Sequence, residues 1–301
     1  MSTFDALVNQ ALKNQRGLAA LRPVVEKEIF HHDIIRELNQ ADLLQHLTFI
    51  DGTCLRACYG STRLSEDLDF TGGANFEKSD LDALKNVLES RLREKYQTPI
   101  SVTDPKAERQ GNVDTWKLRI NTQPERPDMP AQRIHLDICA VPSYQVEPRT
   151  LQNHYRINLG TDNMIINVQS QEEIFADKLI AFGMRPGRLK HRDLWDIAWL
   201  TQRGVRPAYD LLDNILTDHG ESPSEFLTNS ESRLRQLSDD PQIKKDFAFE
   251  MQRFIAPDAL ERTVHQSGFW TYSVNTVSDA IRQAQSRIDG SGEPDQPDFP
   301  M

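Results

Sequence analysis

The chain has 301 residues, of which 38% are hydrophobic and 27% are charged, and its net charge is −10. This length and composition are typical of a soluble globular protein with one large domain or two ordinary ones. The sequence has neither a long apolar run nor a basic leader before an apolar segment, which argues against a membrane span or signal peptide. Its acidity argues against broad, non-specific binding of nucleic acid, but it is compatible with a local basic patch.

The three cysteines, Cys54, Cys58 and Cys139, suit a reducing compartment, and we therefore expect a cytoplasmic protein. Cys54 and Cys58 stand four residues apart on a predicted helix. Because no nearby His or further Cys completes a metal site, we expect both side chains to pack in the core.

The N-terminal part predicts helices that brace a sheet. Apolar residues recur at helical spacing from Phe4 to Leu12, and Pro23 suits the first turn of a second helix that runs to about Leu38. A short apolar run at 47–50 follows, which predicts a strand. Directly after it come Asp51, Gly52 and Thr53 and then a helical piece with Leu55, Cys58 and Tyr59 at helical spacing.

This strand, glycine and helix are a plausible phosphate-binding turn. Glycine after a strand lets the backbone approach a ligand closely, and the small Gly52 and Thr53 leave room for a triphosphate. The N-terminus of the helix that follows favours anions.

Two carboxylates, Asp67 and Asp69, alternate with the apolar Leu68 and Phe70 in the next predicted strand. Alternate side chains of a strand point to opposite faces, so both carboxylates would share one face. Because converging carboxylates repel each other and are costly to desolvate, we expect them to bind a divalent cation, Mg²⁺ or Mn²⁺. The alternative is an edge strand whose acidic side faces water.

Further elements follow in order. Ser79 predicts the N-cap of a helix at 80–95, and three strand-like runs lie at 100–102, 114–120 and 133–140. In the last run Asp137 falls on the face opposite to the apolar residues, which makes it a candidate third metal carboxylate. The alternative for Asp137 is the wet side of an amphipathic strand.

From about residue 170 helical periodicity replaces strands, in segments at 170–183, 190–202, 206–217, 223–236, 241–254 and 265–287. We therefore predict an α+β fold: a mixed sheet with flanking helices at 1–168, then an all-helical domain at 169–288 that completes a cleft. Residues 289–301 are rich in Gly, Pro and Asp and are expected to form a disordered tail.

The helical part contributes two candidate site features. Lys178 falls on an apolar helix face, where it is either a clamp for nucleotide phosphates or a lysine that reaches out to solvent. Residues 185–192 form the densest basic cluster, which is either a contact for triphosphate or RNA or a solvated loop. Asp193 suits the first helical turn, and Asp196 has a possible partner in Arg192 four residues earlier.

The wording GTCLRACYGSTRLSEDLDF at 52–70 and RPGRLKHRDLWD at 185–196 resembles the signature of AbiEii/AbiGii-type nucleotidyltransferase toxins of bacterial toxin–antitoxin and phage-defence systems. The family usually has Gly-Gly-Thr where this chain has Asp51-Gly52-Thr53. The resemblance implies a nucleotidyltransferase fold for the N-terminal part.

It also implies an enzyme that transfers NMP from NTP to RNA, with the tRNA 3′ end as the expected acceptor, pyrophosphate as the product and an antitoxin as partner. We expect no membrane partner. The expected catalytic residues are Asp67, Asp69, Lys178, Asp193 and Asp137. The expected nucleotide contacts are Gly52, Thr53, Arg63, Ser65, Lys178, Arg188, Lys190 and Arg192. The alternatives are transfer to a small molecule or a protein hydroxyl, and an inactive nucleotide-binding module.

Overall fold

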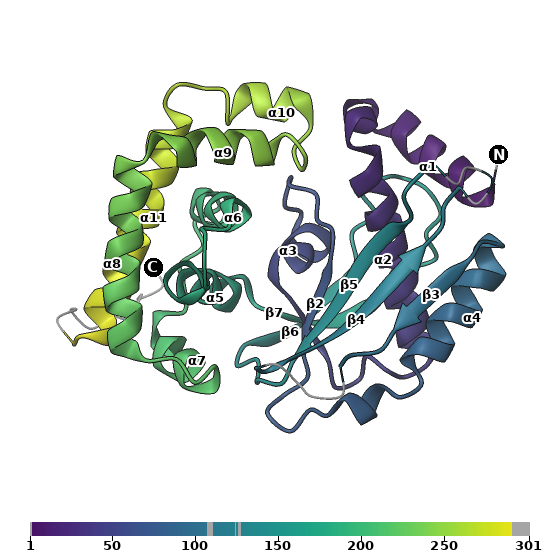
Figure 1. The fold of residues 1–301 in the computed structure, drawn as a ribbon, viewed down its shortest axis with the longest axis horizontal. Helices are drawn as coiled ribbons and strands as arrows, with labels where there is room; N and C mark the ends of the chain where they lie inside the picture. The colour runs from purple at the N-terminus through teal and green to yellow at the C-terminus, as the bar shows by residue number, and fades with distance from the viewer. Residues whose placement is uncertain (1, 107–110, 124, 126–127, 291–301) are drawn as a thin grey trace, which may run out of the picture.

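The computed structural model describes residues 2–106, 111–123, 125 and 128–290, and within these residues one mixed sheet packs beside a group of helices (Figure 1). The strand order in the sheet is β3-β4-β5-β2-β1-β7-β6. The strands are β1 (Thr48–Ile50), β2 (Leu68–Thr71), β3 (Ile100–Thr103), β4 (Val113–Ile120), β5 (Gln132–Cys139), β6 (Val146–Thr150) and β7 (Ile165–Gln169).

The helices fall into an N-terminal set around the sheet and a C-terminal set beside it. The N-terminal set is α1 (Thr3–Asn14), α2 (Arg22–Gln40), α3 (Asp51–Tyr59) and α4 (Leu84–Tyr96), with short 3₁₀ helices at Arg16–Leu21 and Lys78–Leu81. The C-terminal set is α5 (Gln171–Met184), α6 (His191–Gln202), α7 (Leu212–Asp218), α8 (Pro223–Asp239), α9 (Pro241–Met251), α10 (Pro257–Arg262) and α11 (Phe269–Ile288), with a 3₁₀ helix at Tyr209–Leu211.

The C-terminal helices lie to one side of the sheet, with α5 and α6 facing α3 and with α8 and α11 side by side (Figure 1). The predicted α+β fold, a sheet followed by helices, is therefore confirmed. The division at 168/169 stays a prediction, and residues 291–301 of the predicted tail lie outside the described residues. In the described part of the chain, no helix is both long and apolar enough to cross a membrane.

The centre of the sheet places the predicted carboxylates. β2 runs antiparallel to β1, with Ile50 opposite Asp69, and parallel to β5, with Asp69 opposite Asp137. Leu68 and Leu136 are fully buried in the core, so the alternation of side chains sends the two aspartates to the other face. The predicted alternation in β2 and β5 is thus confirmed, and the pairing makes the two aspartates neighbours.

One local prediction was wrong, and two strands were not predicted. Ser79 caps no α-helix, because a 3₁₀ helix with a capping box of Glu77 and Asp80 comes first and α4 begins only at Leu84. Two short strands were not predicted: β6, which is mostly exposed, and β7, which alternates between exposed and buried residues along most of its length. β7 nevertheless matters for the site, because it pairs parallel with β1 and leads directly into α5.

The expected core role of the two helical cysteines is confirmed, since Cys54 and Cys58 are both buried in α3. The prediction that Pro23 lies in the first turn of α2 is also confirmed. Beyond that turn, α2 differs from an ordinary amphipathic helix because it buries Glu28, His31, His32 and Asp33. Buried polar groups need partners, so α2 is a polar support for the elements around it.

The buried histidines of α2 predict a stability loss in acid. His32 is 5% exposed, and its Nδ1 lies 2.8 Å from the hydroxyl of Thr161. Burial lowers the pKa of His32 to about 4, whereas an unfolded histidine titrates near 6.5. Between these values only the unfolded chain takes up the proton, so the free energy of unfolding falls by up to about 3 kcal/mol as the pH drops.

We expect the variant His32→Asn, which keeps a polar atom for Thr161 but does not titrate, to lose less stability in acid. Urea unfolding of both proteins at pH 7.5, 6.0 and 5.0 measures the difference. The buried His31 and His154, whose pKa values burial also lowers, are common to both proteins and cancel in the comparison. Equal losses in the two proteins would contradict this role for His32.

Candidate active site

Two carboxylates line one cavity at the centre of the sheet. Asp69 of β2 and Asp137 of β5 are directly paired, and both face a cavity of about 470 Å³ between the sheet and helices α5 and α7. A cavity of this size is within the range of small-molecule sites. Lys178 of α5 lines the same cavity. The sheet and the helical part therefore bring acidic and basic groups to one place.

The electrostatics of this carboxylate pair fit a divalent cation. Burial, together with the negative charges of Asp51 and Asp137, raises the pKa of Asp69 to about 8. Burial also raises the pKa of Asp137, and its Oδ1 atom is buried without a hydrogen-bond partner within the described residues. A hard cation would supply this missing partner and relieve the repulsion between the two carboxylates.

Asp67 was expected inside the strand, but it lies one residue before β2. Its Oδ1 accepts a hydrogen bond from the backbone N–H of His135 at 3.0 Å. Asp67 is close enough to Asp69 and Asp137 for its charge to raise the pKa of both. Its role as a further metal ligand stays a prediction.

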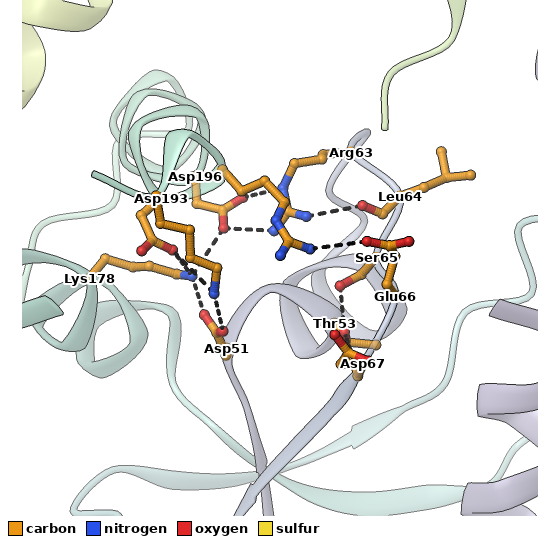
Figure 2. A network of polar contacts seen from close by, with 12 residues as sticks. Asp51, Thr53, Arg63, Leu64, Ser65, Glu66, Asp67, Lys178, Asp193 and Asp196 are labelled. Carbon is orange, nitrogen blue, oxygen red and sulfur yellow. Dashed lines mark hydrogen bonds and ion pairs between the residues drawn. The ribbon is translucent and has the colours of Figure 1, made fainter. Parts of the chain in front are cut away.

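A second acidic cluster is already neutralised by the protein. Carboxylate oxygens of Asp51, Asp193 and Asp196 lie within 4.8 Å of one another. Lys178, which is 3% exposed, contacts all three: it pairs with Asp51 Oδ1, and its Nζ lies 2.7 Å from Asp193 Oδ1 and 3.1 Å from Asp196 Oδ2 (Figure 2). Burial opposes the charge of Lys178, but these carboxylates raise its pKa above the usual value. A metal ion here would have to displace a buried ammonium group.

Arg63 is a structural partner of this cluster. Its guanidinium group donates two hydrogen bonds to Asp196, at 2.9 and 2.8 Å, and one to the carbonyl of Leu64 at 3.0 Å (Figure 2). Arg63 is 2% exposed and Asp196 fully buried. The suggested pairing of Asp196 with Arg192 was therefore wrong, and Asp196 instead orients Arg63 and Lys178.

The backbone of the segment at 64–67, just before β2, forms hydrogen bonds with four residues from other parts of the chain. The contacts are Leu64 N to Phe254 O (2.8 Å), Ser65 N to Glu28 Oε1 (2.9 Å), Glu66 O with His31 Nε2 (3.0 Å), and Asp67 O with the hydroxyl of Thr53. Thr53 gives its one proton to Asp67 O, so the hydroxyl of Ser65 donates to Thr53 at 2.5 Å. Both side chains are buried, so they position Asp67.

The basic residues after α5 spread over several partners. Lys190 Nζ lies 3.5 Å from Asp51 Oδ2, and Arg192 lies 3.8 Å from Glu66. Arg188 is exposed. Their predicted contacts to phosphates stay predictions, because two of these cations have acidic partners in the protein itself.

The predicted residues thus separate into two groups. Asp69, Asp137 and Lys178 line the cavity. The other group, which does not line it, holds the first in place or lies beside it: Gly52, Thr53, Arg63, Ser65, Asp67, Arg188, Lys190, Arg192 and Asp193. Arg185, from the predicted basic cluster at 185–192, also lines the cavity. No role was predicted for two further lining residues, Asp51 and Asp177. Only Asp51 had a signal, as a departure from the usual Gly-Gly-Thr.

A profile of the family described as "Nucleotidyl transferase AbiEii toxin, Type IV TA system" matches residues 33–276. This match covers the central strands, the cavity and most of the C-terminal helices. The chain belongs to the AbiEii toxin family. It is therefore a nucleotidyltransferase from a family of toxin–antitoxin toxins, and the predicted resemblance is confirmed.

Two solved structures resemble this AbiEii-family chain. JHP933 from Helicobacter pylori has 18% sequence identity and a TM-score of 0.46, over 88% of this chain and 95% of that one. A proposed nucleotidyltransferase from H. pylori has 18% identity and a TM-score of 0.41, over 89% of this chain and 99% of that one. No curated protein matches the sequence.

The packing of Arg63 predicts that Gly52 tolerates no side chain. A Cβ atom at Gly52 would lie 2.2 Å from Nη2 of Arg63 and 3.4 Å from Oδ2 of Asp196. We expect Gly52→Ala to break this buried pair and to lower the free energy of unfolding by about 2–4 kcal/mol. Urea unfolding of the variant measures the loss.

The matched control is Gly17→Ala, whose new Cβ would meet its nearest neighbour at 4.0 Å, an ordinary contact. This variant should be as stable as the wild type within about 1 kcal/mol. An unchanged stability of Gly52→Ala would show that Arg63 moves aside without cost.

Proposed function

We propose that the protein is a metal-dependent RNA nucleotidyltransferase, which uses Mg²⁺, or Mn²⁺ in its place, to transfer NMP from an NTP to a tRNA 3′ end. The observation that carries the proposal is the pairing of Asp69 with Asp137 in a cavity that Lys178 also lines. Within the described residues, neither aspartate forms an ion pair with a protein cation. An uncompensated acidic pair beside a lysine suits a metal–polyphosphate ligand.

Asp69 and Asp137 would hold the cation, with Asp67 as a further ligand. When bound, the cation would supply charge stabilisation at the reacting phosphate and alignment of that phosphate with the attacking hydroxyl. Lys178 binds the phosphates as a point charge, and its position is fixed by Asp193 and Asp196 beneath it. These two aspartates are therefore positioning residues in the proposal.

Asp137 is the carboxylate suited to accept a proton. Its pKa is raised by burial, and its Oδ1 atom lacks a hydrogen-bond partner among the described residues. In the proposed reaction, the oxygen of the Asp137 carboxylate that does not hold the cation accepts the proton of the acceptor hydroxyl, while the hydroxyl oxygen forms a bond to the α-phosphorus. The bond from the α-phosphorus to the bridging oxygen breaks, and pyrophosphate leaves.

Exposed and partly exposed basic residues near the 64–67 segment support an RNA acceptor. Arg253, whose side chain is 62% exposed, lies 3.7 Å from Glu66, and Arg192 lies 3.8 Å from the same carboxylate. Arg188 is exposed in the basic loop. Positive side chains that border the site would contact the phosphates of an incoming strand, although the chain is acidic overall. The proposal places the enzyme in the cytoplasm, where tRNA and the cognate antitoxin are available.

The direct test is the transfer of label from each α-labelled NTP to total tRNA in the presence of Mg²⁺. We expect Asp69→Asn to lower the rate roughly 100- to 1,000-fold, because the carboxylate pair loses one of its charges. The control is Asp104→Asn, which removes an exposed carboxylate that pairs only with Lys85 among the described residues. This control should label tRNA at the wild-type rate.

Release of pyrophosphate without labelled tRNA, when proteins or small hydroxyl compounds are supplied, would favour those acceptors instead. No turnover of any NTP would favour an inactive binding module.

Metal removal provides a second prediction. We expect EDTA to abolish transfer, and Mg²⁺ or Mn²⁺ to restore it. We also expect Mg²⁺ to raise the melting temperature of the wild type, because a cation that binds the folded state relieves the repulsion between Asp69 and Asp137. The double variant Asp69→Asn/Asp137→Asn should show no such rise. An equal rise in both proteins would place the cation elsewhere.

A further inference from the structure

Asp51 has an unusual backbone conformation for its position. It is the first residue of α3, directly after β1, and its φ is +61°. Few non-glycine residues adopt this left-handed region, although Asp and Asn tolerate it better than most others. A glycine would suit the turn without strain. The contacts of the Asp51 side chain therefore have to explain why an aspartate occupies this position.

The carboxylate of Asp51 uses a donor of Lys178. The ammonium group of a lysine has three N–H donors. In this structure they meet Asp51, Asp193 and Asp196, and Lys178 is 3% exposed (Figure 2). No donor is left for a phosphate oxygen. If Lys178 binds the nucleotide, one of its three partners has to leave.

Asp51 is the partner that can leave. The side chain of Asp196 is fully buried and is held by Arg63, and that of Asp193 is 5% exposed and lies 3.1 Å from Arg185. The side chain of Asp51 is 26% exposed and lines the cavity, which Asp193 and Asp196 do not. Asp51 also belongs to the sheet side of the site, whereas Asp193 and Asp196 lie with Lys178 on the helical side (Figure 2).

A second lysine has the same partner. Nζ of Lys190 lies 3.5 Å from Oδ2 of Asp51, and its other acidic neighbour, Asp193, is more distant at 3.9 Å. The two oxygens of one carboxylate thus contact two lysines, from α5 and from the residue before α6. Two oxygens of a phosphate group can satisfy the same pair of cations.

We propose that Asp51 occupies the subsite of a substrate phosphate in the free protein and competes with the polyphosphate for Lys178 and Lys190. The subsite takes a phosphate group of a polyphosphate chain, and inorganic triphosphate is its minimal ligand. Asp51 thereby sets the affinity for the nucleotide. This inference rests on the proposed function, because it identifies which contact the nucleotide replaces.

The charges around the subsite agree with such an exchange. Three carboxylates, Asp51, Asp193 and Asp196, face four cations that pair with them. The cations are Lys178, Lys190, Arg63 and Arg185. Without Asp51 the balance becomes more positive by one charge, next to the cavity. An anion that enters then gains both lysines without the cost of breaking an ion pair.

The test is the binding of inorganic triphosphate to the wild type and to Asp51→Asn, measured by calorimetry with EDTA present. Asparagine keeps the shape of aspartate and tolerates the left-handed conformation, so the turn should be retained. We expect Asp51→Asn to bind triphosphate about tenfold more tightly, a difference of roughly 1.4 kcal/mol. Asp51→Gly, which fits φ +61° without strain, should give the same gain.

The matched control is Asp177→Asn. Asp177 lines the same cavity one residue before Lys178, but its carboxylate accepts a hydrogen bond from Gln169 at 2.9 Å and forms no ion pair within the described residues. Removing this charge changes the field of the cavity without freeing a lysine. We expect its gain in triphosphate affinity to be less than twofold. An equal gain in both variants would show a general field effect and overturn the competition.

Steady-state kinetics with Mg²⁺ and NTP separate competition from catalysis. If Asp51 competes with the phosphates, Asp51→Asn lowers KM for the NTP about tenfold and changes kcat by less than about threefold, the smaller change arising from the altered field at Asp69. A collapse of kcat, or weaker binding of triphosphate, would make Asp51 a metal ligand or a necessary support of Lys178 and overturn the inference. If triphosphate binds the wild type and the Asp51 variants with equal affinity, the inference is refuted but the proposed phosphate site is not. If triphosphate binds none of these proteins, the proposed phosphate site is refuted as well.

Discussion

The site depends on the buried ion pair between Arg63 and Asp196, which joins the loop before β2 to α6. A fully buried carboxylate is stable only when its charge is compensated, and Asp196 has Arg63 on one side and Lys178 on the other. Gly52 is needed because the guanidinium group of Arg63 lies where the Cβ atom of any other residue would be. The glycine that the sequence analysis attributed to phosphate binding is therefore required already by the packing of the protein.

A second constraint fixes the position of the metal carboxylates in the chain. The backbone at 64–67 forms hydrogen bonds with α2, α3 and the segment after α9, so its position does not depend on β2 alone. Burial on its own would raise the pKa of Glu28, but Arg56 and Tyr155 keep it below the usual value. An ionised Glu28 is a strong acceptor for the backbone N–H of Ser65. The polar face of α2 thus supports Asp67 through a chain of buried contacts.

The features that the sequence predicted correctly depend on residues that are close together in the chain. The alternation in β2 and β5 gave the faces of Asp69 and Asp137, and the periodicity of α5 gave the buried position of Lys178. The partner of Arg63 was not predictable, because Asp196 lies 133 residues later and Arg192 was a nearer choice. β7 was missed because only alternate residues of a five-residue run are apolar and buried, which is weak evidence without the pairing to β1.

The carboxylates of the site form two groups, one paired with protein cations and one not, and Asp51 interacts with both groups. Asp193 and Asp196 are compensated by protein cations, so they are available as rigid supports and not as metal ligands. Asp69 and Asp137 have no such cation among the described residues, and burial keeps their pKa values raised. Asp51 pairs with Lys178 and at the same time adds to the negative field at Asp69. A metal-bound polyphosphate would satisfy both sides together, since its cation meets the free carboxylates while its phosphates replace Asp51 on the lysines.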